Sequence, residues 1–251
     1  MIAGCLLTTD SYPDFVDISL IFWSTLLIYQ INTKIKFNFL DIQSYTYFQP
    51  PLGIRIKVVI ALIVIIFIHI PFLSFPEIIF LAHLALIATL YNVPDKTKGW
   101  IRLPLRSIPI LKVFLIAYVW ASVSSLLPVI MENMRLFTYD HVTIFVAHFF
   151  FILSITLPFD IRDFSNDNTA ELITIPQLIG IVPTKILALV CLGIFAVLIF
   201  SHLNNWYFEA FLLLTAGLIL FSSPHRKDYY FTFFIDGTII LYFLTIFIPI
   251  K

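Results

Sequence analysis

Long apolar stretches, separated by shorter polar ones, run along almost the whole chain. A helix that crosses the hydrocarbon core of a bilayer needs about 20 mainly apolar residues, because each residue rises about 1.5 Å. By this measure the pattern predicts an all-α, polytopic transmembrane bundle with eight full spans. The predicted spans are 15–32, 56–75, 77–91, 108–131, 140–159, 184–202, 206–223 and 229–250.

The opening segment Met1–Thr9 is also apolar, but it is too short to cross a bilayer alone. It has no basic n-region and no small-residue cleavage site, which argues against a signal peptide. We therefore expect a partial first helix, either short or truncated at its start. No internal repeat or second domain is visible, so residues 1–251 are predicted to form a single integral membrane domain.

The composition excludes a soluble protein. Hydrophobic residues make up 60% of the chain and charged residues 12%, against about 25% charged in an average soluble domain. The mean hydropathy is +0.99. Fifteen basic and fifteen acidic residues cancel, which gives no sign of a nucleic-acid binder. Cys5 and Cys191 both lie in apolar stretches, so neither a disulfide framework nor a zinc site is expected.

The basic residues predict the orientation in the membrane. Of the fifteen Lys and Arg residues, only Arg135 and Lys251 fall on one side of this layout. The positive-inside rule makes the crowded side cytoplasmic and places the C-terminus outside, as in a bacterial inner-membrane protein. The inward connections at 33–55, 93–108 and 159–183 are also the long ones, so we expect the active face to be cytoplasmic.

Three carboxylates follow the predicted span 140–159. Asp160, Asp163 and Asp167 are spaced i, i+3 and i+7, which puts them on one narrow face of a helix. Carboxylates this close repel one another unless a cation joins them, and Mg²⁺ suits a site completed by water and phosphate oxygens. Arg162 in the same turn could clamp a phosphate. The alternative interpretation is a solvated, acidic helix end at the membrane surface.

A second group of charges lies in the predicted loop after span 77–91. It consists of Lys96, Lys98, Arg102 and Arg106. One interpretation is a diphosphate clamp that faces the carboxylates, with Lys96 and Arg102 turned inward. The other is that these residues only set the topology through attraction to anionic lipid headgroups.

Ionisable residues also occur inside the predicted spans. Asp236 lies about 10 Å from the inner end of its span, and His83 lies at a similar depth. An acid inside a bilayer normally faces the bundle interior and has a partner. We therefore predict an Asp236–His83 pair, either as an interhelical hydrogen bond or for activation of an acceptor. For His148, which lies deeper, the sequence identifies no partner.

The segment from Arg162 to Asp167 resembles the second aspartate-rich motif of the UbiA-type intramembrane prenyltransferases. In that family an (N/D)-x-(R/K)-D-x-x-x-D segment precedes a T-(I/L)-P stretch, and residues 174–180 here read TIPQLIG. Leu90-Tyr91, Leu111-Lys112 and Asp236-Gly237 extend the resemblance more loosely. The place of the family's first aspartate-rich motif holds no carboxylate, and Asn32 is its only remnant.

The resemblance implies a UbiA-like helical bundle around a central cavity, with Mg²⁺ as cofactor. It implies transfer of a prenyl group from a prenyl diphosphate to a lipophilic, aromatic acceptor. Asp163 and Asp167 would be catalytic, and Asp160 would join them in holding the metal. The substrate-binding residues would be Lys96, Arg102, Arg162, Asn32 and Tyr91.

Two other functions are weighed against prenyl transfer. The degenerate first motif leaves open a catalytically silent relative that binds or moves an isoprenoid lipid. A secondary transporter would show repeated halves and discontinuous spans, and the sequence shows neither.

Overall fold

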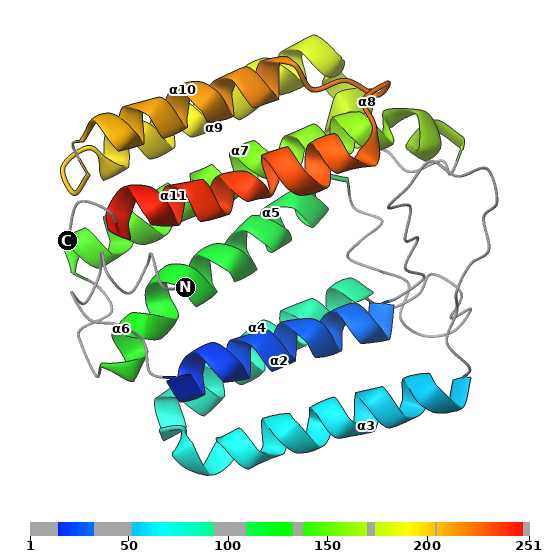
Figure 1. The fold of residues 1–251 in the computed structure, drawn as a ribbon, viewed down its shortest axis with the longest axis vertical. Coiled ribbons are helices and arrows are strands. Elements are labelled where there is room, and N and C mark those ends of the chain that lie inside the picture. Colours follow the sequence, from blue (N-terminus) through cyan, green and yellow to red (C-terminus); the bar gives the residue numbers. More distant parts are fainter. Residues whose placement is uncertain are drawn as a thin grey trace. The chain divides into compact units, whose positions relative to one another are not determined.

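The computed structural model describes the backbone of most of the chain and the side chains of a smaller part (Figure 1). The described backbone covers residues 15–32, 52–92, 109–132, 138–169, 174–203 and 205–247. The described side chains cover residues 15–27, 57–88, 111–132, 138–164, 174–203 and 205–247. Over these ranges the chain is helical and contains no strand, which confirms the predicted all-α class.

Every one of the eight ranges predicted from hydropathy holds a helix. The first helices are α2 (Phe15–Asn32), α3 (Leu52–His69), η1 (Ile70–Phe72), α4 (Phe75–Asn92), α5 (Pro109–Ala121), η3 (Ser122–Leu126) and α6 (Leu127–Met131). They are followed by α7 (Tyr139–Thr169), α8 (Ile175–Ile179), α9 (Ile181–Ile199), α10 (Trp206–Leu220), η4 (Tyr230–Ile235) and α11 (Gly237–Phe247). The short segment η1 is a 3₁₀ turn, whereas η3 and η4 are π-helical turns within longer helical stretches.

The structure is compatible with an integral membrane protein. Among the described residues, four helical stretches are long and apolar enough to cross a bilayer: Leu111–Met131, Tyr139–Phe164, Ile181–Ile199 and Tyr230–Phe247. The other apolar helices are shorter over their described residues. Two further points stay predictions: that all eight helices are full spans, and that their charged ends face the cytoplasm.

The chain divides into two compact units, each described here by itself. One covers Pro13–His83, and the other covers Leu84–Lys251 with Met1–Tyr12. In the first unit α2 packs against α3. Their contact includes a hydrogen bond of 2.6 Å between Ser19 Oγ and His69 Nε2, so a polar contact joins these two apolar helices.

The second unit is built around α7, which packs against α5 on one side and α9 on another (Figure 1). Aromatic rings fill the centre of its core. The ring centroid of Phe151 lies 4.9 Å from that of Phe195 and 5.4 Å from that of Tyr242. Close packing of this kind, rather than hydrophobic exclusion from water, is what joins helices in a lipid environment.

Helix α7 is longer than its predicted span. The prediction ended at residue 159, whereas the helix continues past Pro158 to Thr169. Hydropathy detects only the apolar part of a helix, and the residues after Phe159 are largely polar. The extension matters for function, because it confirms that Asp160, Asp163 and Asp167 belong to one helix, as their spacing predicted.

Candidate functional site

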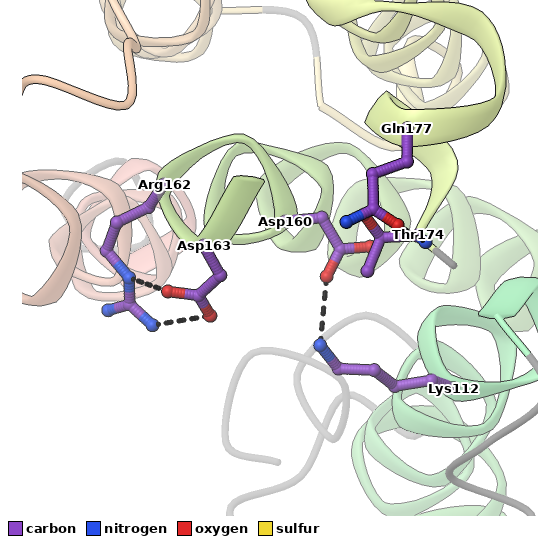
Figure 2. A network of polar contacts seen from close by, with 6 residues as sticks. All are labelled: Lys112, Asp160, Arg162, Asp163, Thr174 and Gln177. Atoms are coloured by element: carbon purple, nitrogen blue, oxygen red, sulfur yellow. Dashed lines mark hydrogen bonds and ion pairs between the residues drawn. The ribbon is translucent and has the colours of Figure 1, made fainter. Parts of the chain in front are cut away.

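The charged residues at the C-terminal end of α7 form two separate ion pairs (Figure 2). The first pair joins α7 to α5, because Lys112 Nζ donates a hydrogen bond of 2.9 Å to Asp160 Oδ1. The Asp160 side chain is only 1% exposed, and that of Lys112 is 25% exposed. A carboxylate this deeply buried needs an opposite charge, and Lys112 supplies it.

The second oxygen of the Asp160 carboxylate is not hydrogen-bonded in the described structure. Asp160 Oδ2 is buried and has no hydrogen-bond partner among the described residues, and the same holds for Thr174 Oγ1. Thr174 is the N-cap residue that precedes α8 (Figure 2). The backbone N–H of Thr174 is satisfied, since it donates to Gln177 Oε1 over 2.8 Å. The ion pair with Lys112 therefore carries most of the compensation for burying Asp160.

The second ion pair lies within α7 itself. The guanidinium of Arg162 grips Asp163 with two hydrogen bonds, Nε to Oδ1 at 2.7 Å and Nη2 to Oδ2 at 3.0 Å. Both side chains are partly exposed, at 26% and 30%. Two parallel N–H···O bonds of this kind fix the relative orientation of a guanidinium and a carboxylate.

Arg162 also contacts aromatic rings and other acids. Its Cζ atom lies 5.2 Å from the ring centroid of Phe159 and 5.7 Å from that of Phe231. Asp228 and Asp236 lie close enough for their negative charges to act on the guanidinium. Arg162 is therefore the central cation of an acidic, aromatic environment formed by α7 and the start of the last helical stretch.

The predicted three-carboxylate magnesium site is not visible as one group. Asp160 and Asp163 lie on the same helix, but the Asp160 carboxylate pairs with Lys112 and the Asp163 carboxylate pairs with Arg162 (Figure 2). Among the described side chains, no group of three or more His, Cys, Asp or Glu residues could hold a metal. The side chain of Asp167 lies outside the described part. In this arrangement the buried Asp160 does not fit a metal ligand, and both oxygens of the partly exposed Asp163 accept hydrogen bonds from Arg162. Magnesium binding stays a prediction.

The other predicted site residues lie wholly or partly beyond what the structure describes. Lys96 and Arg102 fall outside the described residues. For Asn32, Tyr91 and Asp167 the backbone is helical, but their side chains are outside the described part. Whether these five residues converge on Arg162 and Asp163 stays a prediction.

Sequence reasoning missed Lys112 as the partner of Asp160. The available signal was a lysine at the inner end of the predicted span 108–131, the same end at which Asp160 leaves its own span. Asp236, which we predicted to pair with His83, lies within the electrostatic reach of Arg162. His83 belongs to the other unit, so the Asp236–His83 pair itself stays a prediction.

His148, for which the sequence identified no partner, is the centre of a buried hydrogen-bond network. Its Nδ1 atom lies 2.5 Å from Ser125 Oγ on η3, and its Nε2 atom lies 2.9 Å from Tyr242 Oη on α11. The side chain is 3% exposed. Twelve residues of α7 separate His148 from Asp160, or about 18 Å of helix. The network is therefore distinct from the charged site.

A groove of about 310 Å³ with an apolar lining lies between α9 and α10. Its lining includes Val197, Phe200, Phe208 and Leu212. This part of α9 lies about 15 residues, or about 22 Å, from the first residue of α9, which directly follows α8. The groove is thus not part of the charged site.

The chain was compared with protein-family models, with curated proteins and with solved structures, and none of the three comparisons found a match. The resemblance to the UbiA-type prenyltransferases therefore depends on the motif residues alone.

Proposed function

We propose that this chain is a UbiA-type membrane prenyltransferase that moves a prenyl group from a prenyl diphosphate to a lipophilic, aromatic acceptor with Mg²⁺ as cofactor. The observation that carries the proposal is the Arg162–Asp163 pair. It lies in the motif that resembles the family, at the end of an apolar helix, and both side chains are partly exposed. A cation and an acid held together there suit a diphosphate and its metal.

In this mechanism Asp163, with Asp167, would hold Mg²⁺, which neutralises diphosphate charge when bound. Arg162, Lys96 and Arg102 would donate hydrogen bonds to the diphosphate oxygens. The allylic C–O bond breaks and the diphosphate leaves with the electron pair. These cations then stabilise the charge that develops on the leaving group.

The acceptor completes the reaction. Its nucleophilic atom forms the new bond to the allylic carbon, and the proton that the acceptor loses passes to the released diphosphate. The prenyl tail would lie among the apolar helices, where its transfer from water is favourable. Lys112 is already neutralised by Asp160, so its role is to hold α5 and α7 together beside the reacting groups.

The test is release of diphosphate from farnesyl diphosphate by the purified protein in lipid nanodiscs, with a simple phenolic acceptor present. We expect release that requires Mg²⁺ and that falls to the metal-free level in Asp163→Asn. The matched control is Asp140→Asn, which makes the same change at the exposed opposite end of α7 and should keep full release. Equal release by wild type and Asp163→Asn would refute the proposal.

A silent relative that binds an isoprenoid lipid is the second candidate. One observation favours it, namely that residues 25–34 contain no carboxylate at the place of the family's first motif. Loss of that motif should weaken binding of a second Mg²⁺, because amide oxygens carry no net charge. Binding of farnesyl diphosphate without any Mg²⁺-dependent release would assign this function instead.

A further inference from the structure

The π-helical turn η4 brings two residues to the same side of the last helical stretch. The backbone N–H of Asp236 donates to the carbonyl oxygen of Phe231 over 3.1 Å, an i→i−5 hydrogen bond. In a regular α-helix these two positions would point about 140° apart. An i→i−5 bond instead places them nearly one above the other. Both then act on Arg162, Phe231 through its ring and Asp236 through its charge.

Phe231 is rigidly held in this position. Its side chain is fully buried, at 0% exposure, and its ring centroid lies 5.8 Å from that of Phe159. The two rings lie 5.7 Å and 5.2 Å from Arg162 Cζ. Two packed aromatic rings therefore provide a fixed contact for the guanidinium of an otherwise long and flexible side chain.

A contact with rings leaves the hydrogen-bonding capacity of Arg162 intact. A guanidinium can rest on aromatic rings while its five N–H groups remain in its own plane. One N–H on Nε and one on Nη2 bind Asp163. The remaining three donate to no residue in the part of the chain that the structure describes. The rings thus hold the cation without using the donors that an anion needs.

We infer that Phe231, placed by the π-helical turn η4, is a positioning residue that holds Arg162 ready to bind the diphosphate oxygens. This inference rests on the proposed function, because it assigns Arg162 to the diphosphate. Phe231 acts only through Arg162 and does not itself touch the reacting atoms.

The test measures binding of inorganic pyrophosphate to the full chain in nanodiscs by calorimetry, without a prenyl donor. Phe231→Leu keeps an apolar side chain but removes the ring, and we expect affinity to fall about 3- to 30-fold, the range of a cation–π contact. Phe231→Tyr keeps the ring and should retain affinity. The matched control is Phe211→Leu, because Phe211 is a buried ring of the same core with no cation contact in the described part.

The outcomes separate the inference from a general loss of structure. Wild-type affinity in Phe231→Leu, or an equal loss in Phe211→Leu, would overturn the positioning role. If Phe231→Leu does not fold, Phe159→Leu tests the same contact at a partly exposed ring, and an affinity equal to wild type would again overturn it.

Arg162→Gln separates failure of the inference from failure of the proposed function. If pyrophosphate binds Arg162→Gln as tightly as wild type, Arg162 does not bind diphosphate and its assignment under the proposed function fails. If Arg162→Gln loses affinity but Phe231→Leu does not, only the positioning role of Phe231 fails. A loss in both variants, with Phe211→Leu unaffected, is the result we expect.

Discussion

Replacing Lys112 by methionine is expected to lower the free energy of unfolding by about 3–5 kcal/mol, the usual cost of removing one partner of a buried ion pair. The physical reason is that the substitution leaves Asp160 as a buried carboxylate without its cationic partner. Its side chain is 1% exposed, and its second carboxylate oxygen already has no partner among the described residues. Methionine has a similar length and keeps the apolar contacts of the lysine stem, so the loss is electrostatic rather than steric.

Unfolding in mixed micelles containing increasing SDS, followed by helical circular dichroism, gives the required free energies. Lys185→Met is the matched control. Lys185 Nζ donates to the backbone oxygen of Leu220 at the surface, over 2.8 Å, and binds no carboxylate in the described residues. A cation at a helix C-terminus contributes about 0.3–1 kcal/mol, so this variant should be nearly as stable as wild type. Equal effects of the two substitutions would contradict the assigned role of Lys112.

The double variant Lys112→Met/Asp160→Leu isolates the charge effect. It removes both buried charges at once, and an apolar pair of similar volume is often as stable as the ion pair that it replaces. We expect most of the stability lost in Lys112→Met to return. A double variant that is less stable than Lys112→Met would mean that Asp160 is stabilised by something other than Lys112.

The positions of the helices could be predicted from hydropathy because a long apolar stretch has few other options in a membrane. Backbone polar groups in lipid must be satisfied within the segment, so each such stretch becomes a helix. The ends of the apolar spans do not give the ends of the helices. Helix α7 extends ten residues beyond the span predicted to end at 159, since polar residues can continue a helix without any hydropathy signal, and there it was the spacing of the carboxylates that indicated a helix.

The site shows the limit of reasoning from spacing. The i, i+3, i+7 pattern correctly identifies residues on one helix, but it contains no information about the neighbouring helix. Asp160 pairs with Lys112, which is 48 residues away along the chain. Asp163 pairs with its neighbour Arg162, because a long guanidinium side chain can fold back along the helix. Side-chain direction, rather than spacing, decides between these possibilities.

The two π-helical turns could not be predicted at all. A π turn differs from an α-helix by one extra residue within a turn, and this does not change the apolar content of a helix that is hydrophobic on all sides. Both turns nevertheless set polar contacts. The turn η4 brings Phe231 and Asp236 toward Arg162, and η3 brings Ser124 and Ser125 within 3.3 Å and 2.5 Å of His148 Nδ1.

Replacing His148 by leucine is expected to lower the free energy of unfolding by about 2–4 kcal/mol, because two buried hydroxyl groups lose their partner. Ser125 and Tyr242 lie on different helical segments, and each contacts a different nitrogen of this imidazole. The measurement is the same SDS titration. The control, His225→Leu, changes an exposed histidine of the loop after α10 and should alter stability by no more than about 0.5 kcal/mol.

Tyr242→Phe distinguishes loss of this network from a simple packing defect. In the wild type it removes a hydrogen bond from the network, and we expect a cost of about 0.6–1.7 kcal/mol, from the average to the maximum for such bonds between membrane helices. In the His148→Leu background the same substitution removes a buried hydroxyl that has already lost its partner, so it should be neutral or stabilising. An equal cost in both backgrounds would show that Tyr242 and His148 are not coupled. A change of sign would instead show that Tyr242 and His148 are coupled, and that their hydrogen bond between α7 and α11 stabilises the bundle.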